Sequence, residues 1–180
     1  MGLAVSCYKN IRLIETKIDE YEEYYSDEET DYFITNLNED YPDRSKELVD
    51  NSCYGYSDED SFRAGSYGNY NQWRDLLAKF AGYPPIEVER YGRIQTRYDE
   101  YVWQYIDEGD FYELINFSDC EGFLDTMTCK KLYNDFEQNK DRLETFKFEV
   151  NEDATWFKSK YQEWLELFKF ASENGCVSFH

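Results

Sequence analysis

Residues 61–74 combine arginine, tyrosine and small side chains, a composition suited to binding an anionic or nucleotide-like ligand. They have the sequence Ser61-Phe62-Arg63-Ala64-Gly65-Ser66-Tyr67-Gly68-Asn69-Tyr70-Asn71-Gln72-Trp73-Arg74. A small-residue loop before a helix exposes backbone N–H groups, and the helix N-terminus adds its dipole. Guanidinium groups bind phosphate in a fork, and aromatic rings stack on bases. We therefore expect ligand contacts from Arg63, Ser66, Tyr67, Asn69, Tyr70 and Arg74.

The same segment also has a purely structural interpretation. It has neither the Gly-Lys-Ser/Thr of a Walker A loop nor the Gly-x-Gly-x-x-Gly spacing of a dinucleotide-binding turn. In the structural alternative, the segment is a helix N-cap and its glycines allow tight packing. Both interpretations stay open at this point.

A second polar segment, residues 115–122, follows a predicted buried strand at 111–117. Polar groups just past a buried strand are well placed to touch a ligand, so we expect contacts from Asn116, Ser118 and Asp119. The alternative is a simple turn. Cys120 is a poor candidate nucleophile, because the neighbouring carboxylates of Asp119 and Glu121 disfavour a thiolate.

The residue types that usually carry catalysis or bind metal are sparse. The single histidine is His180, the last residue, and the five cysteines contain no Cys-x-x-Cys pair. We therefore expect no catalytic residue, no metal site and no cofactor. A nucleotide-processing enzyme that uses carboxylates with magnesium, or His180 as a base, stays a second alternative.

Charge is strong and uneven. There are 39 acidic and 19 basic residues, a net charge of −20, and residues 1–60 hold 17 acids against five bases. Residues 63–97 reverse this balance, with six bases against three acids. This acidity argues against binding duplex nucleic acid or an anionic membrane. The run at 19–31 is either a solvated loop or a mimic of phosphate charge that blocks a basic surface of a host protein.

Apolar spacing predicts an α+β fold in a single domain, with an acidic part at 1–60 and a core at 61–180. N-terminal antiparallel strands precede about four helices with one or two returning strands. We expect strands at 3–8 and 11–14, joined as a hairpin at Lys9-Asn10, and others at 32–37, 53–56, 111–117 and 176–179. We expect helices at 70–81, 94–106, from Thr128 onward, and at 157–171, with Asn69 capping the first.

Two stretches resemble a family of uncharacterised small proteins from phages and prophage-bearing bacteria. They contain Phe62-Arg63-Ala64-Gly65-Ser66-Tyr67, Tyr70-Asn71-Gln72-Trp73-Arg74, Ala81-Gly82-Tyr83-Pro84 and Phe111-Tyr112-Glu113-Leu114-Ile115-Asn116-Phe117-Ser118-Asp119-Cys120-Glu121-Gly122. The likeness covers 62–84 and 111–136, whereas 1–60 and 86–108 diverge. The resemblance implies a phage-associated protein in the host cytoplasm, and it implies no reaction.

Together these features favour a counter-defence protein that sequesters a nucleotide-type immune signal without catalysis. Arginine would bind phosphate, aromatic rings would stack on bases, and Ser, Asn and Asp would bind sugar hydroxyls. Because such binders commonly place sites between subunits, we expect a homo-oligomer. No apolar run approaches the roughly 20 residues of a membrane span, so we expect a cytoplasmic protein. The first alternative is an acidic inhibitor of a host protein.

Overall fold

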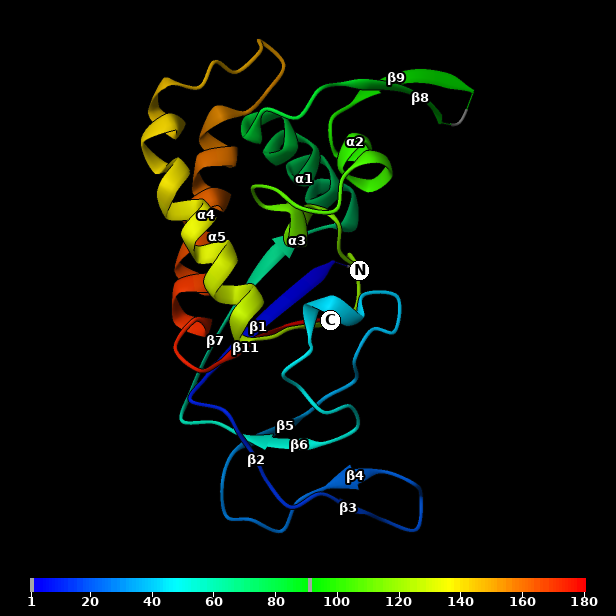
Figure 1. The fold of residues 1–180 in the computed structure, drawn as a ribbon, viewed down its shortest axis with the longest axis vertical. Helices are drawn as coiled ribbons and strands as arrows, with labels where there is room; N and C mark the ends of the chain where they lie inside the picture. The colour runs from blue at the N-terminus through cyan, green and yellow to red at the C-terminus, as the bar shows by residue number, and fades with distance from the viewer. Residues whose placement is uncertain (1, 91) are drawn as a thin grey trace.

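A four-stranded antiparallel sheet lies at the centre of the structure, which is a computed structural model that describes residues 2–90 and 92–180. Its strand order is β10-β11-β1-β7, with β1 (Leu3–Lys9) and β11 (Cys176–Phe179) inside and β7 (Asp58–Gly65) and β10 (Gly122–Leu124) at the edges (Figure 1). The two chain ends therefore lie side by side, and Val5 pairs with Phe179.

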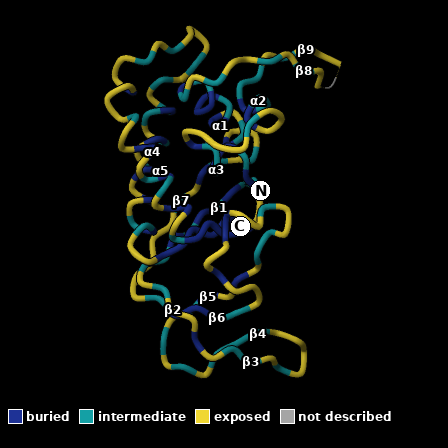
Figure 2. The backbone as a smooth tube through the Cα atoms, viewed as in Figure 1, coloured by how far each residue is buried: buried dark blue, intermediate teal, exposed yellow. Residues whose placement is uncertain are grey.

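Three long helices cover one face of this sheet: α1 (Tyr67–Ala81), α4 (Thr126–Thr145) and α5 (Ala154–Ala171). Leu3, Val5 and Cys7 alternate along β1 and are fully buried in the main core. The centre of that core is aromatic, and the Trp73 and Trp164 rings stack with centroids 5.6 Å apart. Figure 2 shows the buried backbone concentrated between these layers.

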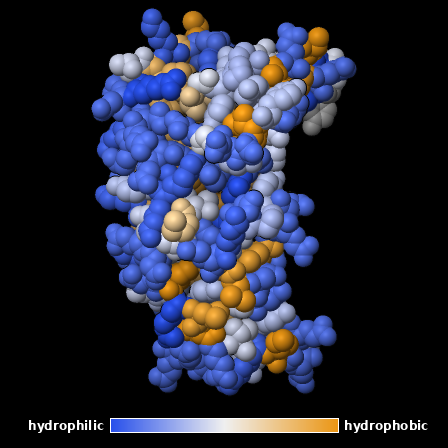
Figure 3. Space-filling model, viewed as in Figure 1, coloured by the Kyte–Doolittle hydropathy of each residue, from blue (hydrophilic) through white to orange (hydrophobic). Residues whose placement is uncertain are grey.

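Much of residues 10–57 forms a smaller lobe at one end of the molecule (Figure 1). Strands β2 (Arg12–Leu13), β5 (Tyr32–Ile34) and β6 (Cys53–Gly55) form its sheet in the order β2-β6-β5, beside the β3 (Lys17–Ile18) and β4 (Tyr24–Tyr25) ribbon. The 3₁₀ turn at Pro42–Arg44 lies nearer the middle of the molecule, where the Arg44 carbonyl accepts from the Asp125 N–H before α4. The lobe joins the main sheet through aromatic stacking of Phe33 on Tyr8, at 4.2 Å, and on Phe123. Figure 3 shows apolar side chains at this end and also at the opposite end of a mostly hydrophilic surface.

The remaining elements lie beside α1. They are the β8 (Ile86–Arg90) and β9 (Arg93–Arg97) hairpin, α2 (Asp99–Tyr105) and the single-turn α3 (Tyr112–Ile115). The α+β class, with N-terminal antiparallel strands, about four helices and returning strands, is confirmed. No helix in residues 2–90 or 92–180 is long and apolar enough to cross a bilayer.

Four local predictions were wrong. The hairpin at Lys9-Asn10 does not form, because Asn10 turns the chain away (φ 52°) and β2 pairs with β6 instead of β1. Residues 94–106 are not one helix, since Ile94 is 72% exposed on β9 and the helix begins only at Asp99. Residues 111–117 contain the short helix α3 rather than a strand. Helix α1 starts earlier than expected, and Ser66 caps it by accepting from the Asn69 N–H.

Candidate functional site

One face of α1 carries three polar side chains at helical spacing, Asn71, Arg74 and Asp75. Arg74 is buried, and its Nη1 donates to the carbonyl oxygens of Phe117 at 2.5 Å and Ile115 at 3.4 Å. Its Nη2 donates to Asn71 Oδ1, and the guanidinium lies over the Tyr70 ring at 4.7 Å. Arg74 therefore holds the end of α3 against α1.

The two polar segments of the sequence meet at this point. Asn71 Nδ2 donates to Asp119 Oδ2 at 2.8 Å, and Arg74 Nη2 lies 4.0 Å from the same oxygen. The Ser118 hydroxyl accepts from the Cys120 and Glu121 backbone N–H groups and so shapes the turn. The Asp119 side chain is 36% exposed, whereas the Arg74 side chain is 6% exposed.

A hollow of about 580 Å³ opens beside this junction, and we call it the Arg74 hollow. Its volume lies within the range of roughly 300–1,000 Å³ typical of small-molecule sites. Aromatic side chains from three separate segments of the chain line it, namely Tyr41, Trp103 and Phe117. Trp103 is 37% exposed, contacts Tyr41 edge-on, and has the Arg74 guanidinium over its ring at 5.7 Å. The hollow thus combines a ring surface with polar groups.

The charged groups of the Arg74 hollow are mixed. Three guanidinium groups line it, from Arg74, Arg90 and Arg97, alongside the carboxylates of Asp40, Asp99, Glu100, Asp119 and Glu121. Arg97 is held by Asp99 at 2.5 Å, and Arg90 pairs with Glu100. Carboxylates therefore outnumber guanidinium groups by two, and no guanidinium in the hollow lacks an acidic or carbonyl partner.

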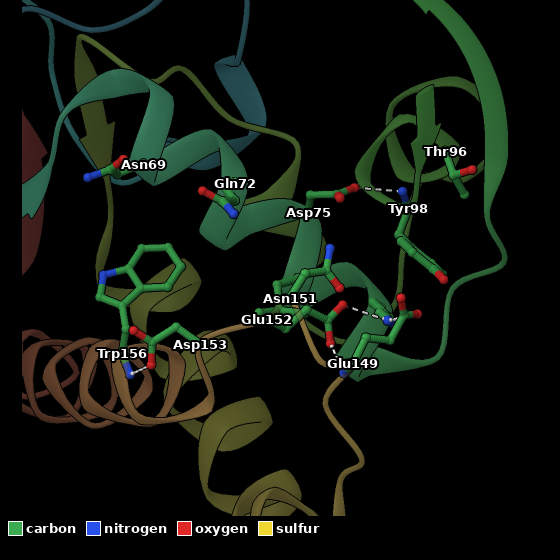
Figure 4. Close-up of a pocket in the computed structure, with 12 residues that line it drawn as sticks. Asn69, Gln72, Asp75, Thr96, Tyr98, Glu149, Asn151, Glu152, Asp153 and Trp156 are labelled. Carbon is green, nitrogen blue, oxygen red and sulfur yellow. Dashed lines mark hydrogen bonds and ion pairs between the residues drawn. The ribbon is translucent and has the colours of Figure 1, made fainter. Parts of the chain in front are cut away.

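A second pocket, of about 680 Å³, is lined by Asp75 and other residues of α1 (Figure 4). Its side chains come from α1, the junction of β9 and α2, the segment before α5, and Trp156 on α5. Lys79 Nζ lies 2.6 Å from both Glu149 and Glu152. Asp75 accepts from the Tyr98 backbone N–H at 2.6 Å. Burial, together with the nearby Asp99 carboxylate, raises the pKa of Asp75 to about 6.

Three of the nine predicted ligand residues line the Arg74 hollow: Arg74, Ser118 and Asp119. The other six lie elsewhere. Tyr70 is fully buried in the main core, and Tyr67 packs against that core. Ser66 caps α1, Arg63 is exposed on β7, and Asn69 lines the second pocket, whereas Asn116 donates to the Tyr112 hydroxyl. Of the six candidate residues within 61–74, the structure therefore brings only Arg74 to the Arg74 hollow.

Sequence reasoning missed Tyr41, Trp103, Arg90 and Arg97 as lining residues. The concentration of basic residues in 63–97 was the only signal for the two arginines, and nothing local marked Trp103. Among residues 2–90 and 92–180, no group of three or more His, Cys, Asp or Glu side chains is placed to hold a metal ion.

Comparisons with protein-family models, with curated proteins and with solved structures found no match. The resemblance to phage proteins therefore stays a prediction.

Proposed function

We propose that the protein binds a nucleotide-like ligand in the Arg74 hollow and holds it without converting it. The observation that carries this proposal is the junction of Asn71, Arg74 and Asp119, which brings two distant polar segments to the edge of one hollow. A buried arginine that clamps α1 to the turn at 117–119 pre-organises the accessible groups, and rigid sites lose less entropy on binding.

The lining groups suit the parts of a nucleoside. The exposed surface of Trp103 offers a stacking platform for a base. Carboxylates bind ribose hydroxyls, and Asp119 is the accessible carboxylate beside Ser118. Because acids outnumber arginines here, a ligand with one phosphate or a phosphodiester fits better than a triphosphate. This is a narrower ligand class than the sequence predicts.

Sequestration of a nucleotide immune signal is the biological role that we propose for this binding, in the phage setting that the sequence resemblance implies. The role requires tight binding and no chemistry. Release of the ligand unchanged is therefore part of the proposal, and a cleaved product would replace it with the enzyme alternative.

Cys120 provides a direct test of where a ligand binds. It lines the Arg74 hollow and is exposed, whereas Cys7, Cys53, Cys129 and Cys176 are buried. We would screen AMP, ATP, cyclic di-AMP and ADP-ribose by thermal shift, and then measure maleimide labelling of Cys120 with each compound. A ligand in the hollow raises the midpoint by mass action and slows labelling.

Two variants separate this site from others. Trp103→Ala should remove the thermal shift and the protection of Cys120, whereas Arg63→Ala should keep both, because Arg63 lies on β7 outside the hollow. A thermal shift without protection of Cys120 would place the ligand elsewhere. A flat response to all four compounds would reject the nucleotide class.

A further inference from the structure

A third pocket lies between α5 and β7, the edge strand of the main sheet. It is a groove of about 510 Å³, which we call the β7–α5 groove. Phe62 and Leu167 provide its apolar floor, and Leu167 is buried. Phe62 is fixed there by an edge-to-face contact with Trp164 at 4.9 Å.

The groove runs along the free edge of the main sheet. Ala4 and His180 exchange both backbone hydrogen bonds, so Ala4 directs its polar groups toward β11. Alternation along β1 then directs Val5 and Cys7 toward β7, where they pair with Phe62 and Asp60. The polar backbone groups of Glu59 and Ser61 must therefore point outward, away from β1.

Side chains already occupy part of that edge. The Glu59 N–H donates to the Asp58 carboxylate at 3.0 Å, and the Ser61 N–H donates to Asp60 at 2.8 Å. Lys160 Nζ donates to the outward carbonyl of Arg63 at 3.0 Å. With these amides occupied, addition of another strand is disfavoured. A second copy of this chain is disfavoured as well, because it would set one Asp58-Glu59-Asp60 run against another.

The charge around the groove is acidic. Asp60, Glu163 and Glu166 line it, and Asp58 and Glu59 continue the charge along the strand. Lys160 lies at its side, where it pairs with Glu163 at 2.6 Å and lies over the Phe62 ring. An apolar floor within an acidic rim is complementary to a cationic, apolar side-chain pattern.

We propose that the β7–α5 groove is a docking site for a basic segment of another protein. A bulky apolar side chain of the partner packs on Phe62 and Leu167, and flanking lysine or arginine side chains pair with Asp60, Glu163 and Glu166. Contacts between side chains hold the partner segment, and it forms no backbone hydrogen bonds with β7. The β7–α5 groove shares no lining residue with the Arg74 hollow, so this proposal does not depend on nucleotide binding.

The test is fluorescence anisotropy with a fluorescein-labelled peptide in which lysines and arginines flank a leucine and a phenylalanine. Glu163→Lys with Glu166→Lys should weaken binding by about tenfold or more, because it reverses two rim charges around a buried anchor. Glu137→Lys with Asp141→Lys is the matched control. These two acids are exposed on α4, and the double change alters net charge by the same amount.

A second peptide, with serines in place of leucine and phenylalanine, tests the apolar floor. Its affinity for the unmodified protein should be about tenfold lower, since the anchor is lost. Equal weakening by the α4 control, or equal affinity of the serine peptide, would show diffuse attraction to a chain of charge −20 and overturn the proposal. Absence of binding by the first peptide would also overturn it.

Discussion

Arg74 and Asp119 lie 4.0 Å apart but differ in exposure: the Arg74 side chain is almost fully buried, whereas over a third of the Asp119 side chain is exposed. The two residues therefore have different roles. Arg74 anchors the turn at 117–119 from behind, and Asp119 is the member that a ligand reaches. Arg74 is accordingly a positioning residue, and its loss should be visible in stability before it is visible in binding.

Arg74→Ala should lower the free energy of unfolding by about 2–4 kcal/mol, because it leaves the buried carbonyls of Ile115 and Phe117 without donors. Urea denaturation measures this change. Arg63→Ala is the control, with an expected effect within about 0.5 kcal/mol because the side chain is exposed. Equal effects of the two variants would show that Arg74 does not clamp α3.

Asp75 should give stability a recognisable pH dependence. Its pKa is about 6 in the folded protein, against 3.8 ordinarily, because of burial and the Asp99 carboxylate. Between about pH 4 and pH 6, Asp75 therefore keeps its proton in the folded state and loses it in the unfolded state. The contribution of Asp75 to the free energy of unfolding falls as pH rises through that window.

Asp75→Asn should remove this fall, because an amide keeps an acceptor for the Tyr98 N–H but carries no charge beside Asp99. Urea unfolding at several pH values between 4 and 7 gives the comparison. Arg97, 3.4 Å from Asp75, loses one partner in the variant but keeps Asp99. Asp141→Asn, an exposed change on α4, should leave the profile of the parent protein intact. Parallel profiles for the parent and Asp75→Asn would contradict the assignment.

One thiol should react in the native protein and five after denaturation. Cys120 is exposed, whereas burial raises the pKa of Cys7 to about 12 and raises the pKa of Cys129 and Cys176 well above the usual value. A thiol needs both access and thiolate character to react. Titration with a disulfide reagent, followed by mass spectrometry of the labelled peptide, identifies the site. Fast labelling of a second cysteine without denaturant would contradict the packing of the core.

Gly175 and Gly68 should respond oppositely to alanine. A Cβ at Gly175 would lie 1.9 Å from the Tyr8 carbonyl oxygen, so Gly175→Ala should cost at least about 1–3 kcal/mol of stability. Gly68 lies in α1, and its nearest neighbour would be Ser66 Oγ at 3.9 Å. Gly68→Ala should therefore stabilise by about 0.5–1 kcal/mol, since alanine favours the helix. Thermal unfolding of both variants distinguishes these signs.

The long helices are predictable because their signals are local. In α5, apolar residues recur every three or four positions over several turns, and Asp153 supplies a cap. The stripe from Ile94 to Ile106 has similar spacing but crosses from β9 into α2, because spacing alone does not mark a change of element. Strand β7 is invisible in sequence, since Asp58-Glu59-Asp60-Ser61 lacks β-forming residues and only pairing with β1 makes it a strand.

The sequence alone thus determines the charge distribution, the long helices and the presence of two polar segments, because these features depend on residues close together in the chain. It does not determine which side of each segment faces the core. Tyr70 and Arg74 are one turn apart, yet Tyr70 packs among Trp73, Trp164 and Phe179, whereas Arg74 reaches the turn at 117–119. The contacts of Tyr70 with Trp164 and Phe179, and of Arg74 with Phe117, join residues far apart in sequence, so they form only when the helices pack on the sheet. Packing, and not local propensity, therefore decided that the two segments share one hollow.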